Sequence, residues 1–265
     1  MNPFWKSLAL VLVAAFLVGL LARPVEEPAW QWVREQEPAL QLESLEDLLG
    51  QGIIVGVMGG FRSIFANLLW IRGSEYWKEQ DLPGMQTMIR LVTAIDPRPS
   101  FFWMNGARIT SLDMPHWRIR EQGGRQNVPE VVQERIFEEQ NLAGIEILHR
   151  AMVYHPNNPQ YPLEIGLIKA RRMDDLEGAL KYYRKASEMP NAPAYAARVY
   201  AQLLRRLGRD QEAYEWLAGI YPTLDPDNIY DRAEVMLRRI RELEEDLNIP
   251  PEERIPELAR DSARK

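Results

Sequence analysis

The chain has 265 residues with a formal net charge of -6 at pH 7, and 46% of its residues are hydrophobic. This composition is typical of a folded protein, and the acidic balance argues against general nucleic-acid binding, which requires a basic surface. The sequence contains no cysteine, which excludes disulfides, thiol catalysis and cysteine-ligated metal.

The N-terminal region predicts a transmembrane signal anchor in residues 1–23. Residues 7–22 form an apolar run without charge. Its length suits either a short membrane span or the core of a signal peptide. Leu20 fits a cleavage site poorly, so we expect an uncleaved anchor, with a cleaved peptide and a buried helix as the alternatives. The residues that we assign to membrane or partner-span contact are Phe4, Trp5, Ala14, Ala15 and Gly19.

The charges beside this run indicate an orientation. Lys6 and the free amine precede it, whereas Arg23 is soon followed by acidic residues. The slight basic bias favours an inside N-terminus and an outside body. We therefore expect a single-pass protein of a bacterial inner membrane, with lipid contact through the N-terminal helix and a periplasmic body. Residues 24–43 are predicted to be a juxtamembrane linker, where Trp30 and Trp32 rest at the lipid headgroups or cover the start of the body.

Residues 52–70 form a second apolar stretch. Glycines recur at every fourth position from Gly52 to Gly60, so a helix places them on one face, where another helix can approach closely. Arg62 and Asn67 oppose a second membrane span because both are costly in hydrocarbon. We favour a buried helix of the body. Contact with the membrane surface or a partner helix, and a true second span, are the alternatives.

The pattern that organises the chain lies in residues 68–103. Met85, Met88, Ile89, Val92 and Ile95 are spaced as on one helix face, and Asp96-Pro97 ends that helix. The preceding helix carries Leu69, Gly73 and Tyr76.

This pattern resembles a tetratricopeptide repeat. Gly73, Tyr76 and Pro97 occupy the small, aromatic and terminating positions of that family, whereas Leu69 and Met85 replace its usual aromatic residue and alanine. The resemblance implies stacked helix pairs that recur along the chain. The predicted repeats begin and end at about 66–99, 100–154, 159–190 and 194–227. In the second repeat, helix is expected to resume at residue 129 or 130 and to run to about 154, and in the fourth Gly208 is expected to supply the turn between the two helices.

The predicted fold class is therefore all-α, with an N-terminal transmembrane helix followed by a TPR-like α-solenoid of about four helix pairs. We assign residues 44–227 to the helical repeats. Residues 228–265 are assigned to a C-terminal capping helix, expected at 229–247, and a tail that is expected to be loose from Arg254 onward. The outer face of the last helix is charged, as a solenoid cap requires.

Residues 113–133 are predicted to be a loop inserted in the second repeat. Pro115, Gly123-Gly124 and Pro129 are helix breakers, and the segment is too long for an ordinary repeat turn. Either the loop contacts a partner or it folds back over the repeat. Its candidate contact residues are His116, Trp117, Arg118 and Arg120.

The resemblance also implies a concave groove lined by the first helix of each pair. The groove residues carried over in this way are Asn67, Trp70, Trp77, Phe101, Met104, Arg108, Arg171, Tyr195, Arg198, Gln202, Arg205 and Arg206. Such a groove is aromatic near the membrane end and basic at the far end. We hypothesise that Arg198, Arg205 and Arg206 hold an acidic portion or C-terminus of another protein. The alternative is that these arginines solvate a helix face and pair with nearby glutamates.

The sequence gives little support for catalysis. Its three histidines, His116, His149 and His155, lack paired metal-ligand spacing, and neither a phosphate-binding glycine loop nor a nucleophile elbow is present. We therefore expect no enzyme activity and no cofactor or metal. The predicted function is that of a membrane-anchored scaffold or accessory subunit that mediates protein–protein interaction in a membrane-bound assembly. A stably integrated structural subunit of an energy-transducing complex, whose transmembrane helix packs on partner spans, is the alternative.

Overall fold

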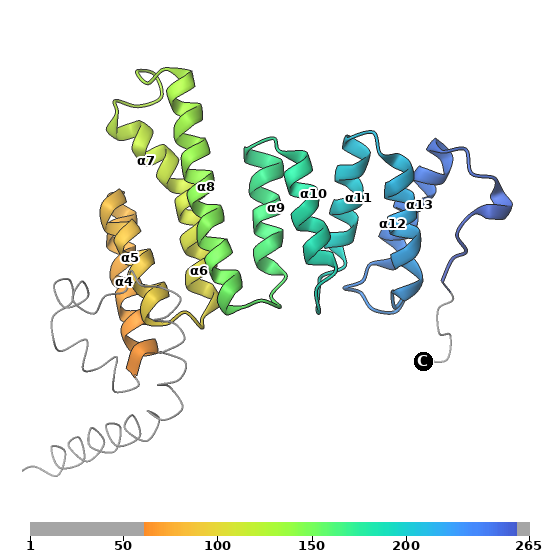
Figure 1. The fold of residues 1–265 in the computed structure, drawn as a ribbon, viewed down its shortest axis with the longest axis horizontal. Helices are drawn as coiled ribbons and strands as arrows, with labels where there is room; N and C mark the ends of the chain where they lie inside the picture. The colour runs from red at the N-terminus through yellow and green to blue at the C-terminus, as the bar shows by residue number, and fades with distance from the viewer. Residues whose placement is uncertain (1–60, 259–265) are drawn as a thin grey trace, which may run out of the picture. The chain divides into compact units, whose positions relative to one another are not determined.

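The computed structural model describes residues 61–258, and every regular element in that range is a helix (Figure 1). This confirms the predicted all-α class for these residues. None of the helices in the described range is long and apolar enough to cross a membrane. The predicted anchor, the linker and residues 52–60 of the second apolar stretch lie outside the described residues. The longer helices are α4 (Arg62–Glu79), α5 (Leu82–Ile95), α6 (Ser100–Arg108), α7 (Met114–Glu121), α8 (Glu130–Tyr154), α9 (Gln160–Arg172), α10 (Leu176–Ser187), α11 (Tyr195–Arg206), α12 (Asp210–Ile220) and α13 (Ala233–Asp246).

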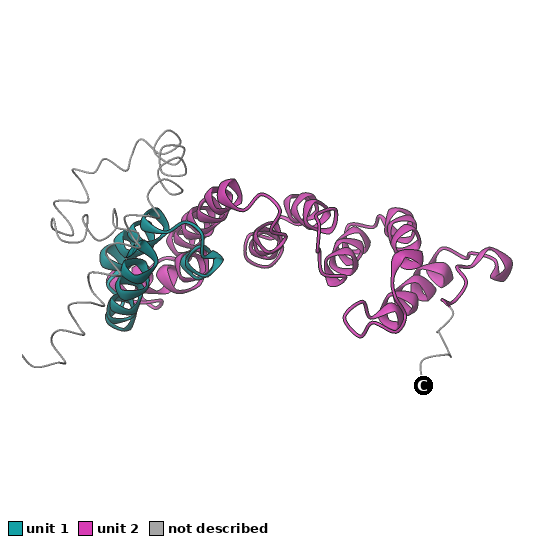
Figure 2. Ribbon diagram, turned by 90° about the horizontal axis from the view of Figure 1, so that it is seen from below, with its two compact units in different colours: residues 1–106 teal, residues 107–265 magenta. Residues whose placement is uncertain are grey.

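The chain divides into two compact units, residues 1–106 and residues 107–265 (Figure 2). The described part of unit 1 holds α4, α5 and most of α6. Unit 2 contains the π-helix η2 (Ile109–Asp113), α7 to α13, and the short 3-10 helices η3 (Tyr221–Thr223) and η4 (Pro251–Glu253).

In unit 1, α4 and α5 form the helix pair that the sequence predicts. All five residues of the predicted apolar stripe, from Met85 to Ile95, are buried. Gly73 permits the close approach of the two helices, because a Cβ placed there would lie 2.9 Å from the Met88 side chain. Asp81 begins α5 by accepting a hydrogen bond from the Gly84 amide at 3.0 Å.

The end of α5 is fixed by a buried carboxylate. Asp96 is 1% exposed and accepts hydrogen bonds from Ser63 Oγ at 2.5 Å and Arg98 Nε at 2.8 Å. Burial raises the pKa of Asp96, but the bonds from Arg98 and Ser63 outweigh it and leave that pKa below its usual value. Trp103 then donates its indole N–H to the Pro97 carbonyl at 2.8 Å, which ties the start of α6 to this turn.

The prediction that residues 113–133 form a loop is wrong for most of that range. Helix continues from α6 through η2 into α7, and the turn is confined to residues 122–129. Pro115 lies in the first turn of α7, where a missing amide is tolerated. Pro115 deprives the Ser111 carbonyl of its usual donor four residues ahead, and Arg172 of α9 donates to that carbonyl at 2.9 Å instead. The helix therefore widens into a π turn at this point and does not break.

The residues predicted to form that loop pack on α8. His116 contacts the Phe137 ring edge to face at 5.2 Å between centroids, and Arg118 pairs with Glu139 at 2.8 Å. Trp117 is buried and Arg118 is half-buried, whereas His116 and Arg120 are exposed. These positions therefore stabilise the α7–α8 pair, apart from Arg120.

From α8 to α13, each helix of unit 2 packs on the next one along the chain, and in Figure 1 these helices stand side by side. Small residues set the spacing, since a Cβ on Gly166 would lie 2.7 Å from the Tyr183 ring. Asp175 caps α10 by accepting from the Gly178 amide at 2.8 Å and also pairs with Lys169 at 2.8 Å. Gly208 takes a φ of +72° in the turn between α11 and α12, as expected from the sequence.

The C-terminal region departs from the prediction in two places. Helix α13 starts at Ala233, and residues 224–232 form a connecting loop where helix was expected from residue 229. The residues after Arg254 were expected to be loose, but the Ile255 amide donates to Glu244 at 2.8 Å and the Leu258 amide to the Tyr221 hydroxyl at 3.1 Å. Glu244 is completely buried, so this anchoring gives its carboxylate a partner.

Candidate functional site

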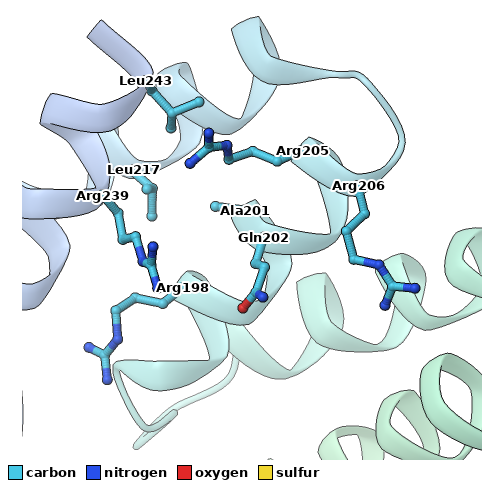
Figure 3. Close-up of a pocket in the computed structure, with 8 residues that line it drawn as sticks. All are labelled: Arg198, Ala201, Gln202, Arg205, Arg206, Leu217, Arg239 and Leu243. Carbon is cyan, nitrogen blue, oxygen red and sulfur yellow. The ribbon is translucent and has the colours of Figure 1, made fainter. Parts of the chain in front are cut away.

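A pocket of about 350 Å³ lies among α11, α12 and α13 (Figure 3). It is named here the arginine pocket, and it is lined by Arg198, Ala201, Gln202, Arg205, Arg206, Leu217, Arg239 and Leu243. Five of these residues belong to α11. Arg198, Gln202 and Arg205 share one face of that helix, because they recur at helical spacing. The opposite face of α11 is apolar and is buried in the core of unit 2.

Arg205 is held by internal carboxylates. Its guanidinium lies 2.6 Å from Asp246 and 3.2 Å from Glu242, both on α13, and 3.5 Å from Asp210 at the start of α12. In Figure 3 its side chain reaches across the pocket toward α13. Arg205 therefore links three helices, and its charge is already neutralised by the protein.

Arg198 is a cation with less compensation. Its Nη1 donates to the Asp231 carbonyl at 3.1 Å, and no carboxylate of residues 61–258 lies within ion-pair distance of it. Burial lowers the pKa of Arg198, and the neighbouring Arg232 lowers it further. An arginine pKa starts so high that the group stays charged, so Arg198 presents a partly desolvated positive charge to the pocket.

The remaining polar residues complete the rim. Gln202 and Arg206 are exposed, and Arg206 points away from the other arginines in Figure 3. Arg239 of α13 extends toward Arg198 and pairs with Glu242 at 2.8 Å. Four arginines therefore face three carboxylates, which leaves the pocket with excess positive charge. Arg239 is absent from the predicted groove residues, because nothing in the spacing of α13 indicates which of its charged residues faces α11.

Two other predicted groove residues of unit 2, Arg108 and Tyr195, lie near Glu164 of α9. Arg108 donates to both carboxylate oxygens of Glu164, at 3.0 and 2.7 Å, and Glu164 is 6% exposed. Burial raises the pKa of Tyr195, and the charge of Glu164 raises it further. Arg171 is exposed and contributes to the electrostatic surroundings of the nearby Tyr183. The carboxylate of Glu164 satisfies Arg108 internally, which makes this cluster a weaker binding site than the arginine pocket.

The other predicted groove residues lie in unit 1. Trp70 packs edge to face on Phe101 at 5.6 Å between centroids, and Phe101 is 54% exposed. Met104 is half-buried, and Trp77 is 46% exposed. Asn67 donates to the Ser63 carbonyl of its own helix at 2.7 Å. Within the described part of unit 1, the predicted groove residues therefore include one aromatic contact, Trp70–Phe101, and two exposed aromatic side chains, Phe101 and Trp77.

A scan of the chain against protein-family models found no match, and a search of curated proteins found none either. Within residues 61–258, no group of three histidine, aspartate or glutamate side chains is placed to hold a metal ion. The chemistry of the arginine pocket is thus the main guide to function.

Proposed function

We propose that this chain is a membrane-anchored, TPR-like scaffold that binds an acidic segment of another protein in its arginine pocket. The observation that carries the proposal is the pocket itself, which four arginines and Gln202 line against three internal carboxylates. Guanidinium groups bind carboxylates through two parallel hydrogen bonds, and arginine is enriched where binding energy concentrates.

The anchored, repeat-based architecture is part of this proposal. The apolar run at residues 7–22 supports the anchor. The successive packing of helices from α8 to α13, with glycines at the contacts, supports the repeat architecture. The body would then lie on the periplasmic side of a bacterial inner membrane. Tethering at the membrane raises the effective concentration of the pocket for any membrane-bound partner.

The pocket is tested by measuring the affinity of a labelled glutamate-rich peptide for the full chain in a non-ionic detergent. We expect salt-dependent binding that weakens about tenfold or more in an Arg198→Gln/Arg206→Gln variant, since charge-assisted hydrogen bonds contribute roughly 1.5–3 kcal/mol. The matched control is Arg238→Gln, an exposed arginine of α13 that does not line the pocket. Equal loss in the control, or no binding by the wild type, would refute the proposal. Competition by inorganic phosphate as strong as by the peptide would identify a general anion site.

A second candidate function is a permanently assembled subunit of a larger membrane complex, and α4 favours it. Ile64, Leu68 and Ile71 follow one another at helical spacing and are 56, 57 and 65% exposed. They lie opposite Gly73 and Ala66, which face α5, so α4 is apolar on both sides. Obligate interfaces are more apolar than transient ones. Purification in mild detergent distinguishes the two, because a permanent complex survives a high-salt wash and a partner held by arginines is released.

A further inference from the structure

Two large apolar side chains close to the arginine pocket are exposed to solvent. Ile229 is 77% and Tyr230 is 82% exposed, and they are the two most exposed large apolar residues of residues 61–258. They are consecutive in the loop 224–232, between η3 and α13. Because they are so exposed, these side chains contribute little to folding by burial. Tyrosine is among the residues that concentrate binding energy in protein interfaces.

The backbone of this loop is held in place by hydrogen bonds. The Asp225 amide donates to Asp231 Oδ2 at 3.0 Å, and the Tyr230 amide donates to Asn228 Oδ1 at 3.0 Å. Two further backbone bonds of 3.1 Å join Asn228 to Asp225 and Asp231 to Asn228. A loop that is ordered before binding loses little conformational entropy when a partner docks, so its apolar pair is suited to a specific contact.

The same loop is attached to the pocket. Arg198, which lines the pocket, donates to the Asp231 carbonyl at 3.1 Å, and Tyr230 is the residue just before Asp231. Neighbouring Cα atoms are about 3.8 Å apart, and an extended peptide advances roughly 3.3–3.6 Å per residue. A carboxylate at Arg198 and an apolar side chain at Tyr230 therefore belong to residues that are close in the sequence of one bound segment.

We propose that the arginine pocket and the Ile229–Tyr230 pair form one composite site. It recognises an acidic segment in which a large apolar residue stands next to the carboxylates. This inference rests on the proposed function and defines its partner more closely. Charge complementarity with the pocket arginines selects the carboxylates, and the exposed pair selects their apolar neighbour.

The test compares three labelled peptides of equal length by fluorescence anisotropy, using the full chain in a non-ionic detergent. The first carries a tryptophan between glutamates, the second replaces that tryptophan with glycine, and the third replaces the glutamates with glutamines. We expect the first peptide to bind about tenfold more tightly than the second, the gain typical of burying one large apolar side chain. The third is expected to bind far more weakly than the first.

Substitution of the loop then locates the preference. In an Ile229→Ser/Tyr230→Ser variant, the first and second peptides should bind with affinities within about twofold of each other, and the affinity of the second should be unchanged. Because both side chains are exposed, the variant is expected to fold normally. Val131→Ser, at a side chain that is 75% exposed on α8, is the matched control and should retain the tenfold preference.

The outcomes separate the two proposals. If the first two peptides bind the wild type equally, the composite site is refuted and the acidic pocket stands. If the preference survives in the loop variant, the apolar contact lies elsewhere and the composite site is refuted as well. If neither glutamate peptide binds, the proposed function itself fails.

Discussion

Replacement of Gly166 by alanine tests the packing that spaces the helices of unit 2. A Cβ at this position would lie 2.7 Å from two atoms of the Tyr183 ring, which is 5% exposed and has little room to move. Overpacking of this kind costs about 1–3 kcal/mol, and alanine recovers about 1 kcal/mol through its higher helix propensity. We expect a net loss of up to about 2 kcal/mol relative to the wild type, and about 1–3 kcal/mol relative to an alanine replacement that meets no clash. For a folded region of this size, each 1 kcal/mol lowers the melting temperature by roughly 2–4 °C.

Thermal unfolding of the full chain, followed by tryptophan fluorescence, measures the effect. Gly219→Ala is the matched control, because nothing lies within 4 Å of a Cβ at that position on α12, and it should leave the melting temperature unchanged or slightly higher. In a Tyr183→Ala background the clash is absent, so the added alanine should no longer destabilise. A Gly166→Ala protein as stable as the Gly219→Ala control would show that α9 and α10 are not packed so closely.

Three further predictions concern polar contacts of unit 2. Glu164→Gln removes the charge that accepts both bonds from Arg108 and should cost about 1–3 kcal/mol in denaturant unfolding, with a smaller added loss once Arg108 is also replaced. Arg172→Met leaves the Ser111 carbonyl without its side-chain donor and should cost about 1–2 kcal/mol in the same assay. Asp175 has a pKa lowered chiefly by its lysine partner, then by the capped amide. Its stabilisation is therefore complete above the unfolded pKa and is lost as the pH falls through the lower folded value. Asp175→Asn keeps the cap but does not titrate, so its stability should fall less in acid than that of the wild type.

Sequence periodicity predicted the helices whose apolar stripe is continuous. The stripe from Met85 to Ile95 and the helix from Glu130 to Tyr154 agree with the structure within a residue or two. These elements are encoded locally, since the same side chains that define the period also form the buried face. Breaker residues were a poorer guide. Pro115 was one of the breakers behind the predicted loop at 113–133, but the donor that replaces its amide at the Ser111 carbonyl comes from Arg172, which is 61 residues from Ser111 in sequence.

The start of α13 was misplaced for a related reason. Ile229 and Tyr230 extend the apolar pattern of the last helix, so helix was expected from residue 229, whereas α13 begins at Ala233. Asn228 and Asp231 instead form local hydrogen bonds that compete with helix, and Arg232 adopts a left-handed conformation with a φ of +48°. Ile229 and Tyr230 therefore lie before the start of α13, and both are exposed.

The arginine pocket shows what one helix face can and cannot reveal. The spacing of Arg198, Gln202 and Arg205 was enough to bring them together in the prediction, because all three lie on α11. The prediction treated Arg198, Arg205 and Arg206 as equivalent, but their surroundings in the structure differ. Arg205 contacts carboxylates of α12 and α13, so its removal would loosen the cap as well as change the pocket. Loss of binding after substitution of Arg205 would therefore not distinguish a ligand contact from a displaced α13. Arg198 and Arg206 have no carboxylate partner within the described range, so substitutions there report on the charge that a ligand meets.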